Sequence, residues 1–584
     1  MFGKIKYIDD ITAIVEVNKE NMIVPNLMNL HVVFESGEDK LLGEVKKADE
    51  ETVHIDLMGQ FVGDRFIAGT IKKPTLDSKI RIINDAELNI IMGSNQPGSL
   101  YIGKSAIYNG KDVFVDINDM FSNHLSIFGN TGSGKSCSVA RIIQNIFLNK
   151  QFLTFNANLF IFDAYGEYKS AFKVLNQFNP NYQYKFITSN CVDDTDVPLR
   201  IPVFLLTVDD MCLLLQADNH HQFTIVERML KLAKLFSKDD EDTRRLKNHL
   251  IAKAIMSVLF SNQTAAGKKN DIFTIIADCS TPEFNVDTDI QGIGYVRKFS
   301  ECFGVDRNGE FGESVLINEY LLKFIDDEIE QRMDVPVDAY YTLDDLEKAL
   351  SFTLIGDGFL GNRIMQDNAV ILQVRLHSLN NSSNRFFFDI PQYITLENYI
   401  SSLIVMNGKR SQIVNINLED IDDILAKTIV KIFSKMIFDF AKSRKERAAI
   451  PFHLFVEEAH RYVVKDNDQF LLGYNIFERI AKEGRKYGVM LDLVSQRPVE
   501  ISETVIAQMS NFCILKMTHP RDLDYINKML PNISGDIIEK LTSLQSGTMV
   551  AFGSAFKIPV IIKMDMPNPS PYSSNCDVVN RWKA

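Results

Sequence analysis

The sequence predicts an α/β fold, in which helices cover both faces of a parallel β-sheet. Short apolar strands alternate with amphipathic helices over 116–199 and again over 396–565, and this alternation is typical of parallel sheets. A glycine-rich loop at 129–136 follows the first of these strands and opens a helix. Because 584 residues exceed what one hydrophobic core usually fills, we expect more than one domain.

Three segments depart from this alternation. Residues 1–115 contain short, β-branched runs separated by polar turns, which predict a small N-terminal antiparallel β-barrel or sandwich. Residues 200–395 contain amphipathic stretches and polar loops, and we interpret them as a mainly helical insertion that divides the α/β core. The tail, 566–584, is rich in Pro, Ser and Asn, so we expect it to be extended or loosely ordered.

Composition narrows the class of protein. A hydrophobic content of 46% and a charged content of 24% are typical of a globular chain. We see no signal peptide and no apolar run as long as a membrane span, so we expect a cytoplasmic location. Seven scattered cysteines without a CxxC pair favour free thiols and no metal cage. The net charge of -13 argues against a surface that binds nucleic acid everywhere, but it allows a basic channel.

The loop "GNTGSGKS" matches G-x-x-x-x-G-K-S/T in full. Its glycines let successive N–H groups point at phosphate oxygens, and the following helix adds the positive end of its dipole. We expect Lys135 to reach the β- and γ-phosphates and the Ser136 hydroxyl to bind Mg²⁺, with ATP and Mg²⁺ as cofactors. A glycine turn without a ligand is the disfavoured alternative. The predicted nucleotide contacts are Gly129, Asn130, Thr131, Gly132, Ser133, Gly134, Lys135, Ser136 and Cys137.

Hydrolysis also needs carboxylates at the end of a second strand. The stretch "HLFVEEAHR" supplies them, because its apolar run ends at Glu457 and Glu458. We predict that Glu457 holds the Mg²⁺ shell and that Glu458 orients and deprotonates the attacking water. Glu457 stands where such sites usually have Asp, so its longer side chain is expected to contact the metal through water. A solvated acidic strand end is the alternative interpretation.

Two further polar positions are candidates for contact with the γ-phosphate. In "VMLDLVSQRP", Gln496 follows another strand, and its amide can sense the γ-phosphate or hold the water; a capping role is the alternative. In "AKEGRKYG", Arg485 lies at a helix end. It can neutralise charge on the γ-phosphate across a subunit boundary, or it can simply cap the helix, and the sequence favours neither.

Other polar clusters can be explained by ordinary structural roles as well as by functional ones. Asp163 and Glu167 follow the second strand of the core and either cap the next helix or order waters near the metal. His220 and His221 are expected to form a surface pair and not a metal site. The run "KSRKER", residues 442–447, is expected to be a solvated helix end, with phosphate contact as the alternative.

Taken together, these motifs resemble the HerA family of hexameric ATPases, in the HerA/FtsK branch of P-loop proteins. The resemblance rests on the phosphate loop and its preceding segment, "IFDAYGEY", "FVEEAHR", "RIAKEGRKYGVMLDLVSQRP" and "SGTMVAFGSAFKIPVIIKM", in that order. It implies a RecA-like P-loop core capped by an N-terminal barrel. It also implies a homohexameric ring, with ATP sites between subunits and duplex DNA in the channel. Arg485 stands at the position of the family's trans-acting arginine, and Glu457 replaces the usual Asp of "DEAH".

The resemblance further implies a partner. HerA-like proteins work with a nuclease, or with a SIR2-like effector in bacterial antiphage defence, and the large insertion and acidic charge favour a defence-type member. We therefore expect an ATP-dependent motor that translocates on or unwinds double-stranded DNA and assembles with such an effector. The alternative is a nucleotide-dependent ring scaffold with little translocation. A protein or conjugation translocase is disfavoured, because no membrane segment is seen.

Overall fold

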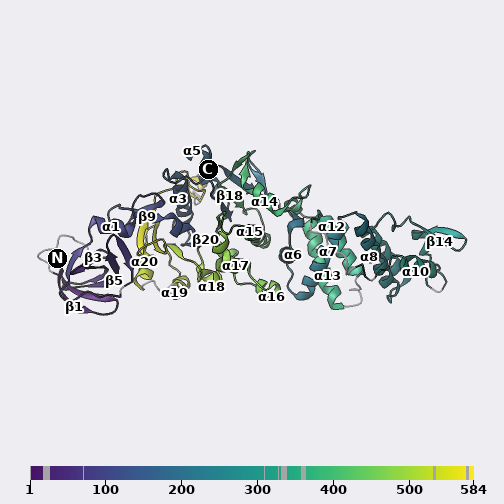
Figure 1. Cartoon of the computed structure of the whole chain (residues 1–584), viewed down its shortest axis with the longest axis horizontal. Coiled ribbons are helices and arrows are strands. Elements are labelled where there is room, and N and C mark those ends of the chain that lie inside the picture. Colours follow the sequence, from purple (N-terminus) through teal and green to yellow (C-terminus); the bar gives the residue numbers. More distant parts are fainter. Residues whose placement is uncertain are drawn as a thin grey trace. The chain divides into compact units, whose positions relative to one another are not determined.

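The computed structural model divides the chain into two compact units (Figure 1). The first unit comprises 1–197, 400–466 and 475–584, and the second, which we call the helical unit, comprises 198–399 and 467–474. Within these bounds the structure describes residues 2–17, 27–69, 71–307, 309–326, 328–329, 338–356, 363–529, 535–573 and 578–583.

The first unit begins with an antiparallel sheet, drawn in purple in Figure 1. Alternate residues of its strands face two different cores: Val33 and Leu42 pack toward the rest of the unit, whereas Phe34 and Leu41 pack into a separate cluster within the sheet. Its strands are β1 (Phe2–Ile8), β2 (Thr12–Val17), β3 (His31–Ser36), β4 (Asp39–Ala48), β5 (Thr52–Val62), β6 (Arg65–Ala68) and β7 (Lys79–Ile82).

The expected barrel is not confirmed. The strand order is β1-β2-β5-β4-β3-β7, with β6 beside β5, and no ladder among the described residues joins β7 back to β1. The antiparallel pairing was expected, but closure requires the two ends of the sheet to meet, and alternation along single strands carries no information about that.

A second sheet of 12 strands forms the centre of the first unit, in the order β13-β12-β18-β11-β19-β20-β10-β21-β22-β23-β8-β9. From β12 to β21 every pairing is parallel, and from β21 to β9 every pairing is antiparallel. Its strands are β8 (Ser99–Ser105), β9 (Asp112–Asp116), β10 (Leu125–Phe128), β11 (Leu159–Asp163), β12 (Tyr184–Thr188), β13 (Val197–Pro198), β18 (Ile413–Asn417), β19 (Phe452–Val456), β20 (Val489–Ser495), β21 (Asn511–Leu515), β22 (Thr548–Gly553) and β23 (Val560–Lys563).

Apart from the half-buried first residue of β12, the parallel strands from β12 to β21 are buried along their whole length, as strands covered on both faces must be. The α/β prediction is therefore confirmed. Helix α3 (Lys135–Leu148) buries an apolar face that includes Val139, Ile143 and Phe147, and α15 (Asp423–Ser443) is a long helix with most of its side chains buried. The other helices are α1 (Asp85–Met92), α2 (Ile117–Phe121), α4 (Lys169–Phe172), α5 (Leu175–Phe178), α14 (Leu396–Leu403), α17 (Ile476–Glu483), α18 (Glu503–Ile506), α19 (Pro520–Met529), α20 (Gly535–Ser543) and α21 (Val578–Trp582).

Short 3-10 turns complete the first unit: η6 (Ala459–Arg461), η7 (Gly484–Tyr487) and η8 (Pro498–Glu500), together with the small hairpin of β16 (Val405–Met406) and β17 (Lys409–Arg410). Part of the C-terminal tail, including Cys576, lies outside the described residues. The six cysteines of the described part are free thiols. Among the same residues, no helix combines the length and the hydrophobicity that crossing a bilayer requires.

The helical unit is built around α7, α8, α9 and α12, which contact one another through apolar faces. Its elements are η2 (Val203–Leu205), α6 (Val208–Leu214), α7 (His220–Phe236), α8 (Glu241–Leu259), α9 (Ala265–Asp278), β14 (Asp289–Gly292), β15 (Tyr295–Lys298), η3 (Phe299–Cys302), α10 (Ser314–Leu322), α12 (Leu343–Gly356), α13 (Arg363–Asn380), η5 (Ser383–Phe388) and α16 (Asp468–Leu472).

Candidate functional site

The glycine-rich loop connects the end of β10 to the start of α3. Gly132 and Gly134 adopt φ angles of 75° and 95°, in the left-handed region that favours glycine. A Cβ atom at Gly134 would lie 3.1 Å from the backbone nitrogen of Gly547, so this position leaves little space for a side chain. Lys135 is the first residue of α3, which places the loop's N–H groups at a helix N-terminus.

The loop is fastened from outside by segments far away in the sequence. The Asn130 N–H donates to the carbonyl of Lys516 at 2.9 Å. A turn before β22 supplies two more bonds: the Gly547 N–H donates to the Ser133 carbonyl at 2.9 Å, and the Ser546 hydroxyl donates to the Gly132 carbonyl at 3.0 Å. The sequence analysis did not anticipate this turn, which fixes the loop's backbone without occupying its N–H groups at those two residues.

A chain of hydrogen bonds joins the predicted catalytic side chains at the carboxyl ends of three neighbouring strands. Lys135 Nζ lies 3.4 Å from Glu458 Oε1, and Gln496 Nε2 donates to the same oxygen at 3.3 Å. Thr131 Oγ1 in turn donates to Gln496 Oε1 at 2.6 Å. These contacts arise because β10 lies beside β20, and β20 lies beside β19, all parallel.

Glu458 is held in an unusual backbone conformation, with φ 48° and ψ 47°. A non-glycine residue there carries strain of about 1 kcal/mol or more, and such strain is typical of functional sites. His460 lies beside it: its Nδ1 is 3.1 Å from Ser495 Oγ and 3.2 Å from Glu458 Oε2. Burial lowers the pKa of His460. The sequence analysis did not single out His460, although it stands two residues after the carboxylate.

Glu457 belongs to a second group of acidic side chains, which also includes Asp163 and Glu167. Tyr168 donates its hydroxyl to Glu457 Oε1 at 3.3 Å, and burial followed by the charges of Asp163 and Glu167 raises the pKa of Glu457 well above its ordinary value. Burial also raises the pKa of Asp163, which accepts the Tyr168 N–H at 3.0 Å and the Asn415 amide at 3.1 Å. Asp163 is thus held by structural hydrogen bonds, although it does not cap α4, which has no side-chain cap.

These carboxylates fit a divalent cation. Oε2 of Glu457 and Oε2 of Glu167 are both buried without a hydrogen-bond partner in the described part of the chain, and a hydrogen bond from Ser136 opposes the rise in the pKa of Glu167 caused by burial. None of the described residues form a group of three or more His, Cys, Asp or Glu placed to hold a metal alone. Mg²⁺ characteristically binds through one or two protein oxygens together with phosphates and waters, so the residues suit it.

Arg485 does not join this cluster. It is exposed in η7, before the amino end of β20, whereas the loop and Gln496 lie at the carboxyl ends of their strands. The seven residues of β20 alone span roughly 20 Å. Arg485 therefore lies too far along the sheet to reach the phosphate loop of its own chain.

A cavity of about 500 Å³ opens beside the loop, lined by Asn130, Thr131 and Gln496 together with Arg497, His519 and Arg521. The last three were not predicted as site residues. Of the other clusters, His220 and His221 are exposed at the start of α7. In "KSRKER", Lys442 and Arg447 stack over the ring of Tyr487 at the exposed end of α15.

Comparisons with known proteins agree with the recognised motifs. Residues 100–284 match the family model described as "Helicase HerA, central domain". The "DNA double-strand break repair helicase HerA" of Saccharolobus solfataricus is 33% identical over 204 residues, which cover 34% of this chain and 40% of that protein. A "Probable DNA double-strand break repair helicase HerA" of Methanocaldococcus jannaschii is 23% identical, over 93% of this chain and 89% of that protein.

The alignments to the first five of these curated relatives cover only 35–40% of their lengths. Among solved structures, VirB4 of Thermoanaerobacter pseudethanolicus is 13% identical with a TM-score of 0.45, over 82% of this chain and 99% of that chain. The bacterial conjugative coupling protein TrwBdeltaN70 is 12% identical with a TM-score of 0.43, over 84% of this chain and 94% of that chain. By its matched segment, the region of this chain from 100 to 284 is similar to the central domain of the HerA helicases.

Proposed function

We propose that this chain is an ATP-driven motor, with a RecA-like P-loop core, that moves along or unwinds double-stranded DNA. The observation that carries the proposal is the bonded chain of Thr131, Gln496, Glu458 and Lys135 around the phosphate loop. It brings together a phosphate-binding lysine, a carboxylate and an amide in one place. The HerA relatives, named as DNA double-strand break repair helicases, support DNA as the track.

In this proposal each side chain has one role. Lys135 leaves Glu458 and binds the β- and γ-phosphates of ATP, which frees the Glu458 carboxylate to accept the proton of the attacking water. Gln496, held by Thr131, positions that water. Ser136 and Glu457 hold Mg²⁺, which when bound neutralises the charge on the phosphates. The strained backbone of Glu458 keeps its carboxylate directed at the loop while its charge partner changes.

The place of Arg485 supports a ring. An arginine that is about one strand length from its own phosphate loop can stabilise the γ-phosphate only in a neighbouring subunit. We therefore propose a homohexamer with ATP sites completed in trans. We also propose that the ring works with a nuclease or SIR2-like effector in antiphage defence, on the strength of the family resemblance. The competing function, a nucleotide-dependent scaffold with little translocation, shares the same site.

Steady-state ATP hydrolysis with and without duplex DNA tests the motor against the scaffold. We expect DNA to stimulate the wild-type rate several-fold at low salt, because phosphate contacts are strongest there. Lys135→Ala should abolish hydrolysis under both conditions and serves as the control for contaminating ATPases. A rate that is indifferent to DNA at low salt would contradict the motor and favour the scaffold.

A further inference from the structure

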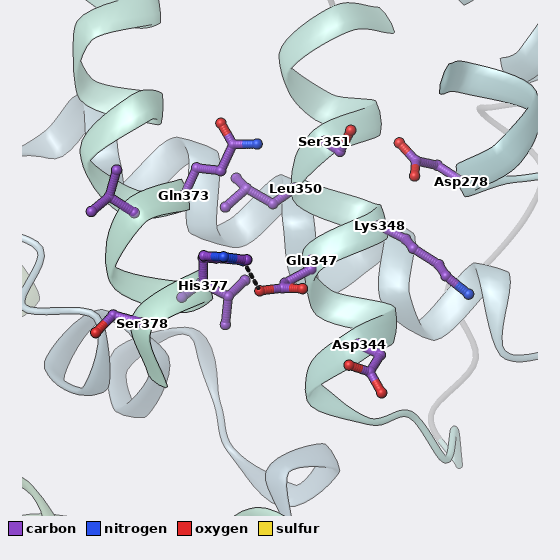
Figure 2. A pocket seen from close by; sticks show the side chains of 11 residues that line it. Asp278, Asp344, Glu347, Lys348, Leu350, Ser351, Gln373, His377 and Ser378 are labelled. Atoms are coloured by element: carbon purple, nitrogen blue, oxygen red, sulfur yellow. Dashed lines mark hydrogen bonds and ion pairs between the residues drawn. The ribbon is translucent and has the colours of Figure 1, made fainter. Parts of the chain in front are cut away.

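The helical unit contains a groove of about 920 Å³ that is remote in sequence from the phosphate loop. It runs along α12, with α13 on one side and the last residue of α9 on the other (Figure 2). Leu350 and Leu376, both fully buried, form its floor. Figure 2 shows Glu347 of α12 and His377 of α13 facing each other across the groove, joined at 3.2 Å. A groove between two helices has the shape that accepts a third helix.

The walls of the groove are acidic. Asp278, Asp344 and Glu347 line it together with Lys348 and His377. Arg385, outside the lining, pairs with Asp344 at 2.7 Å, so Asp278 and Glu347 are the carboxylates that a further cation would meet. Oδ2 of Asp278 is shielded from water and has no hydrogen-bond partner in the described part of the chain. Burial raises the pKa of Asp278 to about 6, although a hydrogen bond from Ser351 and the charge of Lys348 oppose the rise. A cationic group in the groove would relieve this burial cost, because an opposite charge favours the ionised carboxylate.

An apolar stripe on α13 continues from the groove. Ile364, Val370, Ile371 and Val374 are 61%, 46%, 42% and 63% exposed, and Val374 also lines the groove. The spacings of three, four and seven residues place these side chains on one side of the helix. A soluble protein gains free energy by covering such a stripe, and contiguous exposed apolar surface beside a groove is typical of interaction sites.

The net charge of the insertion that forms most of the helical unit also favours a basic ligand. Residues 198–399 contain 31 Asp and Glu but only 20 Lys and Arg, a net charge of -11 out of -13 for the entire chain. Such a surface repels DNA phosphates and attracts basic groups. The acidic character of the protein is therefore concentrated in the unit that lacks the phosphate loop.

We propose that the groove between α12 and α13 docks a basic amphipathic helix of a partner protein, with the helix's apolar face on the α13 stripe and its cations beside Asp278 and Glu347. The proposal rests on the proposed function in one respect, that the chain works with a protein partner. It assigns that contact to the helical unit. The acidic charge of the groove excludes nucleic acid as its ligand. The exposed apolar stripe calls for a partner that supplies an apolar face as well as cations.

The test uses the full chain and a labelled peptide of about 18 residues, or five helical turns, that carries Leu on one face and Lys on the other. We expect saturable binding in fluorescence anisotropy. We expect no binding of the matched peptide with Glu in place of Lys, and at least tenfold weaker binding of a scrambled Leu/Lys peptide. Glu347→Lys should weaken binding about tenfold, because it reverses a charge that the peptide contacts. Val374→Ser should weaken it several-fold by removing apolar contact.

Matched controls separate the groove from general acidity. Glu319→Lys and Val315→Ser make the same changes on the exposed face of α10, outside the groove, and should leave affinity within about twofold. Equal weakening by Glu347→Lys and Glu319→Lys, or displacement of the peptide by duplex DNA, would overturn the proposal. DNA-stimulated ATPase is measured on the same preparations, so a failed motor and a failed docking site give different results.

Discussion

Replacing Glu458 by Gln tests the centre of the site without removing the side chain. Gln is the same size and its oxygen still accepts from Lys135 and Gln496, so the substitution removes the charge and the proton-accepting power and little else. Loss of a general base lowers a rate by about 10²- to 10⁴-fold. We therefore expect kcat for ATP hydrolysis to fall by that amount while the protein folds normally.

The same substitution should tighten ATP binding. At the 3.4 Å separation of Lys135 Nζ and Glu458 Oε1, the attraction is about 5 kcal/mol at an effective dielectric constant of about 20. Most of this attraction is offset by the desolvation of the two buried groups. We therefore assign the Lys135–Glu458 pair a net interaction free energy of about 1 kcal/mol, which the nucleotide must overcome to recruit Lys135. Glu458→Gln removes this competition, and the Kd for ATP should fall by about fivefold to tenfold.

Two measurements on one variant check this reasoning. Hydrolysis is followed by phosphate release, and affinity by titration of a fluorescent ATP analogue in the presence of Mg²⁺. A kcat within tenfold of wild type would refute the assignment of Glu458 as the base. Weaker nucleotide binding would refute the exchange of partners at Lys135, even if hydrolysis is lost.

Three other predictions follow from the geometry. Arg485→Ala protein mixed into wild-type rings should inhibit ATPase by more than simple dilution, and a linear mixing curve would contradict completion of the site in trans. Gly134→Ala should lower the free energy of unfolding by about 1–2 kcal/mol and weaken ATP binding, as seen in urea titrations with and without nucleotide; Gly37→Ala, with φ 63° but no atom within 4 Å, should leave ATP binding unchanged. Burial lowers the pKa of His31 and of His124 to about 4, so the unfolded chain binds more protons below pH 6.5. Stability should therefore be complete above pH 6.5 and fall by up to about 3 kcal/mol per histidine as the pH drops to 4, and His31→Gln should flatten that decline in chemical denaturation.

Local patterns in the sequence were sufficient to predict the fold class and the glycine-rich loop. The apolar face of α3 repeats at helical spacing, and its residues Val139, Ile142, Ile143, Ile146 and Phe147 are all buried. Gly132 and Gly134 stand where the backbone of the loop adopts positive φ angles, and the motif identifies both positions without any hydrophobic periodicity. The barrel was the weak part of the fold prediction, because alternation reveals which face of a strand is buried but not which strands lie at the edges.

The structure also revealed contacts that the motifs alone do not predict. His460 lies beside Glu458, and Ser546 and Gly547 brace the loop from more than 400 residues away. The groove of the helical unit likewise depends on how α9, α12 and α13 pack, since each helix alone reads only as amphipathic.

The sequence by itself determined that this chain carries a phosphate-loop motif between a strand and a helix, because the motif lies within eight consecutive residues. Only the tertiary structure decided that Glu458 and Gln496 meet Lys135 and that Arg485 does not. Strand neighbours are chosen by packing over the whole sheet, and the order β19-β20-β10 brings together side chains separated by more than 300 residues of chain. Direction along the parallel strands then places Arg485 toward the amino ends of the strands, away from the phosphate loop.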